Sequence, residues 1–299
     1  MRKTSDAYSR ATTHRVQIDG TSIAYRVFGK GPALVFVHGW PLSGHTFRGL
    51  ANHLHADFTC YVPDLPGAGQ SPPRAGARET FTDFAALLGG FVDAVKLDRF
   101  CVAGNDSGGT IARLLAVAMS ERVDGMFLFN TETPGRMPWL VRVLQWVTRL
   151  PAAAWMIRQL LNVRAYRNSA LGFGGCFEDE RLLDGQFFEV TVRPLLQDPS
   201  AAVSVLRQAD LSIVDRLQKM HGEIACPVLC IWGESDRFFP IADARHMVDE
   251  WPNATLHALP GRRLLVHEES PQEVARVMRE FALKPARSFP RQNSGMMVT

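Results

Sequence analysis

The sequence is poor in cysteine, and its five cysteines are scattered without a C-x-x-C pair. This spacing matches neither the usual ligand pattern of a structural zinc site nor the dense disulfide framework of small secreted domains. Cys101, Cys226 and Cys230 fall in apolar runs typical of strands, so we expect them to be buried. Because the sequence also has no clustered histidines and no phosphate-binding loop, we expect neither a metal nor a cofactor.

The sequence also lacks a marked excess of charge and a long apolar run. Its formal net charge is +3, with 21% charged and 46% apolar residues, and no stretch of about 18 apolar residues occurs. We therefore expect no nucleic-acid partner and no membrane partner. Residues 1–13 are polar and lack the apolar centre of a signal peptide, so a cytoplasmic location is expected. A monomer and a homodimer are both compatible with this composition.

What the sequence does contain is an alternation of apolar strand-like runs and amphipathic helical patterns, which predicts an α/β fold with a mostly parallel, eight-stranded sheet and helices on both faces. The expected strands lie at 14–29 (two strands around Asp19-Gly20), 32–38, 58–65, 100–105, 123–130, 227–232 and 254–259. The expected helices include 45–55, 80–97 with Thr80 as a cap, 111–119, 241–251 and 271–283.

The alternation is interrupted between residues 134 and 217, where only helical patterns occur. We interpret this segment as an inserted helical cap on a core formed by residues 14–133 and 218–284. Residues 1–13 are expected to form a polar arm, and residues 285–299 a frayed tail.

One turn between a strand and a helix carries the strongest functional signal. In Gly104-Asn105-Asp106-Ser107-Gly108-Gly109, small residues stand two positions before and two positions after Asp106. A strained nucleophile elbow requires such small residues around its tip. Ser107 at the tip fits less well, because Asn105 would then occupy a small-residue position. An ordinary glycine-rich turn is the alternative interpretation.

Four blocks together resemble the α/β-hydrolase superfamily with a helical cap, over about residues 16–283. They are His38-Gly39-Trp40-Pro41, Asp64 to Ser71 in the pattern D-x-x-G-x-G-x-S, the elbow at Gly104 to Gly109, and Trp232-Gly233-Glu234-Ser235-Asp236. An aspartate at the elbow narrows the resemblance to epoxide hydrolases and to haloalkane and haloacetate dehalogenases. The resemblance implies that Asp106 attacks an sp³ carbon to form an alkyl ester, that backbone N–H groups of Trp40 and Ser107 form the oxyanion hole, and that Asp236 is the acid that orients a histidine.

The histidine itself is missing. The family places it seven residues before the proline that opens the final helix, and here this position is Leu264. Three interpretations remain open: a hydrolase whose hydrolysis step is impaired, a non-hydrolytic lyase, isomerase or cyclase that uses Asp106 as acid or base, and a shift that lets His267 act as the base. A catalytically inactive ligand-binding protein is a further alternative. Otherwise His267 is expected to be a polar surface residue.

The substrate expected from the sequence is a small apolar molecule. Ser107 replaces the Trp or Arg that usually follows the nucleophile in dehalogenases, and the cap has one tyrosine, Tyr166, where epoxide hydrolases use two. His38, Trp40 and Glu132 are expected to line the pocket, with Glu132 either an acid facing the cavity or a helix cap. Cap aromatics are expected to form an apolar roof; they are Trp139, Trp146, Trp155, Phe173, Phe177, Phe187 and Phe188.

Overall fold

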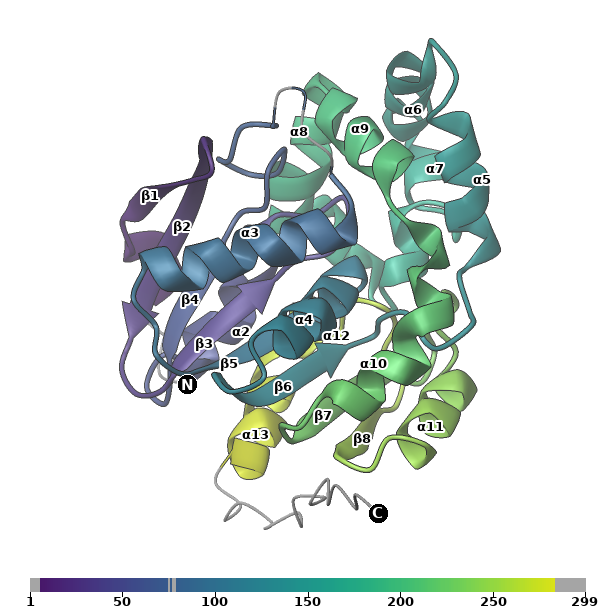
Figure 1. Cartoon of the computed structure of the whole chain (residues 1–299). Coiled ribbons are helices and arrows are strands. Elements are labelled where there is room, and N and C mark those ends of the chain that lie inside the picture. The colour runs from purple at the N-terminus through teal and green to yellow at the C-terminus, as the bar shows by residue number, and fades with distance from the viewer. Residues whose placement is uncertain (1–5, 75, 77–78, 283–299) are drawn as a thin grey trace, which may run out of the picture.

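The predicted eight-stranded sheet is confirmed by a computed structural model, which describes residues 6–74, 76 and 79–282. The strand order is β1-β2-β4-β3-β5-β6-β7-β8 (Figure 1). The β1–β2 and β2–β4 pairs are antiparallel, and all other neighbours are parallel. The strands are β1 Thr13–Ile18, β2 Thr21–Gly29, β3 Ala33–Val37, β4 Thr59–Pro63, β5 Phe100–Asn105, β6 Val123–Phe129, β7 Val228–Gly233 and β8 Ala254–Leu259.

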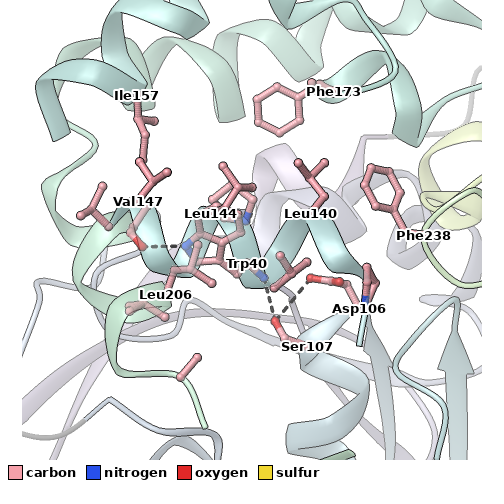
Figure 2. Close-up of a pocket in the computed structure, with 18 of the residues that line it drawn as sticks. Trp40, Asp106, Ser107, Leu140, Leu144, Val147, Ile157, Phe173, Leu206 and Phe238 are labelled. Carbon is pink, nitrogen blue, oxygen red and sulfur yellow. Dashed lines mark hydrogen bonds between the residues drawn. The ribbon is translucent and has the colours of Figure 1, made fainter. Parts of the chain in front are cut away.

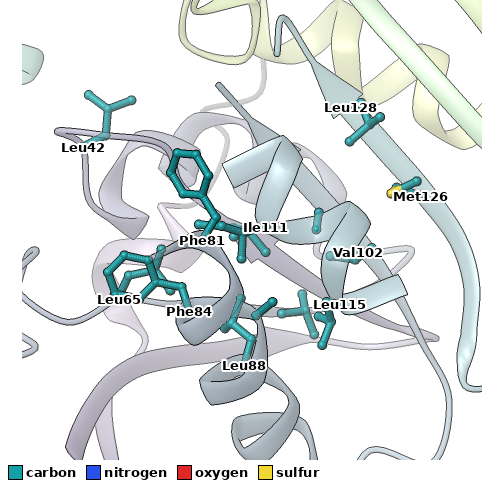
Figure 3. Close-up of a cluster of buried hydrophobic side chains, with 14 of the residues drawn as sticks. Leu42, Leu65, Phe81, Phe84, Leu88, Val102, Ile111, Leu115, Met126 and Leu128 are labelled. Atoms are coloured by element: carbon teal, nitrogen blue, oxygen red, sulfur yellow. The ribbon is translucent and has the colours of Figure 1, made fainter. Parts of the chain in front are cut away.

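The central strands are buried on both faces because helices cover each side of the sheet. Side chains alternate along a strand, so in β6 Met126 and Leu128 enter one hydrophobic core while Phe127 and Phe129 enter the other. Figure 3 shows Met126 and Leu128 on the side of the first core. The helices of this core are α3 Phe81–Ala94, α4 Ser107–Ala118, α10 Leu217–Glu223 and α11 Ile241–Asp249. Those of the opposite core are α2 Arg48–Leu54 and α13 Pro271–Ala282, with the short η1 Gly44–Phe47 and α12 Val266–Glu269 beside them.

Local sequence signals explain where these helices begin. Thr80 caps α3 as predicted: its hydroxyl accepts a hydrogen bond from the N–H of Asp83, whose carboxylate accepts one from the N–H of Thr80. This reciprocal pair satisfies two backbone donors that a helix start leaves free. The α3 helix therefore starts at a defined residue and presents Phe84, Leu88 and Phe91 to the first core.

The segment between β6 and β7 contains helices and turns and, in its described residues, no strand of the sheet. We call residues 134–217 the cap. Its elements are α5 Trp139–Val147, α6 Ala153–Asn162, α7 Arg164–Arg167, η2 Phe173–Cys176, η3 Glu180–Asp184, η4 Phe188–Val192, α8 Arg193–Gln197, α9 Ser200–Gln208 and η5 Leu211–Arg216. The two ends of the cap meet, because the N–H of Gly135 donates to the carbonyl of Val214 at 2.9 Å. Within the described ranges, no helix combines the length and the apolar character needed to cross a bilayer.

The region expected to be a polar arm is partly packed on the core. A short helix, α1 Ala7–Arg10, places Tyr8 against Phe28, and the Tyr8 hydroxyl accepts a hydrogen bond from Arg26. Tyr8 is 2% exposed, so it acts as a core residue. Residues 1–5 of the expected arm and the expected tail 285–299 lie outside the described residues.

Candidate active site

Asp106 lies at the tip of a strained turn between β5 and α4. Its backbone has φ 51° and ψ −135°, a conformation that non-glycine residues rarely adopt. The flanking glycines are required by space: a Cβ at Gly104 would lie 2.4 Å from the carbonyl oxygen of Gly108, and a Cβ at Gly108 would lie 2.2 Å from that of Val37. The turn therefore has the geometry of a nucleophile elbow with Asp106 at its tip.

A short hydrogen-bonded chain runs from Asp106 to the loop after β3. The Ser107 hydroxyl lies 3.4 Å from Oδ2 of Asp106 and accepts a hydrogen bond from the N–H of Trp40 at 2.9 Å (Figure 2). The Trp40 N–H that was expected to stabilise an oxyanion is thus already bonded to the Ser107 hydroxyl. The indole N–H of Trp40 is also engaged, since it donates to the carbonyl of Ala202 in α9 at 2.7 Å.

Three carboxyl groups gather at the ends of neighbouring strands. Asp106 follows β5, Glu132 follows β6 and Asp236 follows β7, which places all three at the carboxyl edge of the sheet, where α/β folds bind ligands. Burial, and next the negative charge of Glu132, raise the pKa of Asp106 well above its ordinary value. Burial raises the pKa of Asp236 to about 6.

Glu132 is held by hydroxyl groups and lies near a buried cation. Its Oε2 accepts a hydrogen bond from Thr110 and lies 2.8 Å from the Thr131 hydroxyl, which in turn accepts one from the guanidinium of Arg113. Arg113 is fully buried, and burial lowers its pKa to about 10, so it stays protonated near neutral pH. The sequence interpretation missed this network, although an arginine inside the apolar α4 helix was a visible signal.

Asp236 has partners, and a histidine is not one of them. Its Oδ2 accepts a hydrogen bond from the Asn130 side chain at 2.6 Å, and its Oδ1 accepts one from the N–H of Phe238. Arg262 and Arg263 do not bond to Asp236; they bond to Ser270 and to backbone carbonyls of the cap. An amide and a backbone N–H therefore hold this carboxylate.

The expected position of the catalytic histidine does face the cavity. Leu264 lines the cavity with Asp106, and its backbone carbonyl accepts a hydrogen bond from the Asn105 side chain at 3.2 Å. Leu264 therefore lies in the wall of the cavity that also contains Asp106.

Both predictions for His267 are wrong, because it is neither an alternative base nor a surface residue. Its ring is 0% exposed and packs on Phe47 and Phe129 in the opposite core, and its Nε2 lies 2.9 Å from the Thr46 hydroxyl. Burial lowers the pKa of His267 to about 3, so the ring is neutral. Three residues beyond Leu264 the chain has entered α12, which turns this side chain away from Asp106.

Above Asp106 lies an apolar cavity of about 280 Å³ between the sheet edge and the cap. Its walls come mainly from Leu, Val, Ile, Met and Phe side chains of the cap, several of which Figure 2 labels above Asp106. Among the described residues, its ionisable or hydroxyl-bearing side chains are Asp106, Ser107, Glu132, Tyr166 and Cys176. The expected placement of Trp40, Glu132 and Tyr166 at the cavity thus agrees with the structure.

Two residues expected in the pocket lie elsewhere. Trp139 is 66% exposed and does not line the cavity, because its position on α5 faces outward. His38 lines a smaller neighbouring cavity of about 40 Å³, and both ring nitrogens are bonded to backbone, with Nε2 accepting from the N–H of Leu65. Of the expected aromatic roof, Phe173 lines the main cavity, whereas Trp146 and Trp155 are exposed.

The family comparison agrees with this arrangement. Residues 32–271, most of the chain, match the protein family described as the alpha/beta hydrolase fold. The chain belongs to the α/β-hydrolase fold family.

Similar α/β-hydrolases have several activities. The chain is 27% identical to the pimeloyl-[acyl-carrier protein] methyl ester esterase of Aeromonas salmonicida, covering 87% of this chain and 99% of the relative. It is 26% identical to haloalkane dehalogenase 2 of Mycobacterium tuberculosis, covering 83% and 86%. The solved structure of the epoxide hydrolase CorEH superposes with a TM-score of 0.75 at 20% identity, covering 91% of this chain and 98% of that one. Esterases, dehalogenases and epoxide hydrolases thus occur among similar family members, and the residues of the site have to distinguish them.

Proposed function

We propose that this α/β-hydrolase is an enzyme of the epoxide hydrolase and dehalogenase type, in which Asp106 attacks an sp³ carbon of a small apolar substrate. The observation that carries the proposal is the position of a carboxyl group, in place of a hydroxyl, at the elbow tip facing the apolar cavity. A carboxylate attacks carbon without first losing a proton to a base. A carboxylate Oδ forms the new C–O bond, and the bond to the leaving atom breaks with its electron pair going to that atom.

The polar groups near Asp106 favour oxygen over halide as the leaving atom. An opening epoxide needs a proton donor, and Tyr166, whose side chain carries a hydroxyl, lines the cavity. A halide needs N–H donors, but the Trp40 indole N–H is bonded to Ala202, and a serine follows the nucleophile. We therefore propose an apolar epoxide as the preferred substrate class.

Hydrolysis of the alkyl ester is the step that these residues support poorly. Water attacks an ester efficiently when a general base removes its proton, and a positioned base contributes about 10² to 10⁴ in rate. No histidine lines the cavity among the described residues, and the residue that we assign to the position of the base, Leu264, cannot accept a proton. The proposed outcome is an ester on Asp106 that forms readily and decays slowly.

Intact-mass measurement tests this proposal directly. The protein is incubated with apolar alkyl epoxides and, in parallel, with bromoalkanes of equal chain length. We expect a mass increase equal to one epoxide that maps to the peptide containing Asp106, and no increase in the isosteric control Asp106→Asn. Steady formation of diol without an adduct contradicts the slow second step, and the absence of both adduct and product contradicts the nucleophilic role.

A second candidate is a non-hydrolytic lyase, isomerase or cyclase in which Asp106 acts as an acid. Its support is the raised pKa of Asp106, which is caused by burial and next by the negative charge of Glu132 and which suits a carboxyl group to act as an acid. Product formed in ¹⁸O-labelled water separates the two candidates: unlabelled product without an adduct favours acid–base chemistry, whereas an adduct favours the nucleophile.

A further inference from the structure

The large apolar side chains that are exposed in the described part of the chain all lie between residues 139 and 171. On α5, Trp139, Val143 and Trp146 are 66%, 46% and 62% exposed. Their spacing of four and three residues places them on one helical face. The opposite face of α5 lines the cavity through Leu140 and Leu144. An ordinary surface helix is polar on its outer face, so the outer face of α5 is apolar where water alone would favour polar residues.

The next cap elements also expose large apolar side chains. Trp155 on α6 is 63% exposed, and Val163, just after α6, is 54% exposed. Figure 1 shows α5 and α6 at the outer edge of the cap, on the side away from β1 and β2. We call Trp139, Val143, Trp146, Trp155 and Val163 the cap-edge patch.

The same part of the cap carries a concentrated positive charge. Residues 133–177 contain six arginines and no Lys, Asp or Glu, although the whole chain has a net charge of only +3. The rest of the chain is therefore net negative by three. Arg142, Arg149 and Arg158 are exposed, and none of them forms an ion pair within the described ranges.

We propose that the cap-edge patch binds the surface of an anionic lipid bilayer. Tryptophan rings place their apolar body and N–H at the boundary between lipid and water, and neighbouring arginines are attracted to anionic headgroups. The charge disfavours the other apolar partner, a second copy of this chain, because identical patches would bring like-charged arginines together. The whole-chain charge that predicted no membrane partner concealed this local excess.

The cavity reaches the surface beside this patch. Leu160 and Leu171 line the cavity and are nonetheless 42% and 50% exposed, so they lie at its mouth. A molecule dissolved in the bilayer could then enter the cavity without crossing water. The corresponding substrate class is a lipophilic compound that partitions into membranes. This substrate class rests on the proposed function, whereas the binding of the patch to a bilayer does not.

Vesicle flotation of the full chain tests the proposal. Vesicles of phosphatidylcholine alone are compared with vesicles containing one quarter phosphatidylglycerol. We expect binding to the anionic vesicles with a blue shift of tryptophan emission. We also expect about 30-fold weaker binding for Arg142→Ala with Arg149→Ala, since each arginine near an anionic surface contributes about a factor of 5. The variant Trp139→Ser with Trp146→Ser should bind more weakly to both vesicle types.

The matched control is Arg15→Ala with Lys219→Ala, which removes the same charge from β1 and α10, outside the cap-edge patch. Equal loss in this control overturns the proposal, because binding would then follow net charge alone. Absence of wild-type binding to anionic vesicles also overturns it. A wild-type dimer that the two Trp substitutions convert to a monomer, without vesicle binding, identifies a second copy as the occupant instead. None of these readouts depends on Asp106, so the vesicle assay and the adduct assay can fail independently.

Discussion

Replacing Leu264 with histidine should accelerate the ester hydrolysis that we propose to be slow in this chain. Leu264 faces the cavity with Asp106, and its backbone contact with Asn105 does not involve the side chain. The loop that carries Asp236 is bonded to the loop before Leu264, because the N–H of Ser235 donates to the carbonyl of Arg262 at 2.9 Å. A histidine at position 264 therefore has a carboxylate within the same pair of loops to orient it.

The size of the gain follows from two opposing contributions. A positioned general base contributes about 10² to 10⁴ in rate, or about 3 to 5 kcal/mol of barrier. Against this, Asp236 must share or give up its hydrogen bond to Asn130, and a hydrogen bond to a charged group contributes about 1.5 to 3 kcal/mol. We therefore expect ester decay in Leu264→His to be faster than in wild type by about 20-fold, from a net gain of about 2 kcal/mol.

The assay follows the lifetime of the adduct. Each protein is loaded with an apolar epoxide, excess reagent is removed, and the mass of the adduct is followed over time at pH 8, where an imidazole is neutral. The control Leu264→Gln introduces a polar side chain of similar size that cannot act as a base. An unchanged adduct lifetime in Leu264→His, or an equal gain in Leu264→Gln, would refute the assignment of this position to the base.

Three further predictions concern Asp106, Trp40 and Ser107. Because the pKa of Asp106 is raised in the folded state, its stabilising effect is complete below the unfolded-state pKa near 4 and is lost as pH rises through the folded-state value. Asp106→Asn should therefore have the same melting temperature as wild type below pH 4 and an increasingly higher one above pH 4. Its gain in the free energy of unfolding should reach about 1.4 kcal/mol for each unit by which the folded-state pKa exceeds the unfolded-state pKa. A stability difference that does not change with pH in calorimetry contradicts this. Trp40→Phe removes the indole bond to Ala202 and should lower the free energy of urea unfolding by about 1 kcal/mol, while unchanged stability means that the bond contributes nothing. Ser107→Ala frees the Trp40 N–H for an oxyanion and should accelerate ester decay about tenfold, since one hydrogen bond contributes about 1.5 kcal/mol; slower decay in the adduct assay shows that the hydroxyl assists the reaction instead.

Much of the fold could be predicted because each signal is local. Apolar runs such as 123–130 are buried on both faces of the sheet, and this burial requires continuous apolar sequence. The glycines around Asp106 could be interpreted because steric exclusion acts within a few residues. Glu132 could be placed near the cavity because it directly follows a strand of the parallel sheet, and the carboxyl ends of parallel strands lie at one edge of the sheet.

The remaining features depend on contacts that the sequence does not display. Trp139 is aromatic on an amphipathic helix, but periodicity does not say which apolar face of α5 meets the cavity when both faces are apolar. His267 looks polar, yet its burial against Phe47 follows from how α12 docks on the opposite core. The Asn130–Asp236 bond joins residues 106 positions apart, and no local pattern marks such a pair.

The hydrogen bond between Gly135 and Val214 holds the two ends of the cap together, so the segment between them can be exchanged as a unit. Both ends of the insertion meet at one point beyond β6, and α10 then leads back to β7 beside it, as an ordinary crossover between parallel strands would. Because the entropy of closing a loop grows only with the logarithm of its length, the sheet and the elbow place little restriction on the segment between these ends. Evolution or engineering can therefore lengthen, shorten or replace this segment, and with it the walls of the cavity and the apolar outer surface, while the carboxyl groups at the strand ends stay where they are.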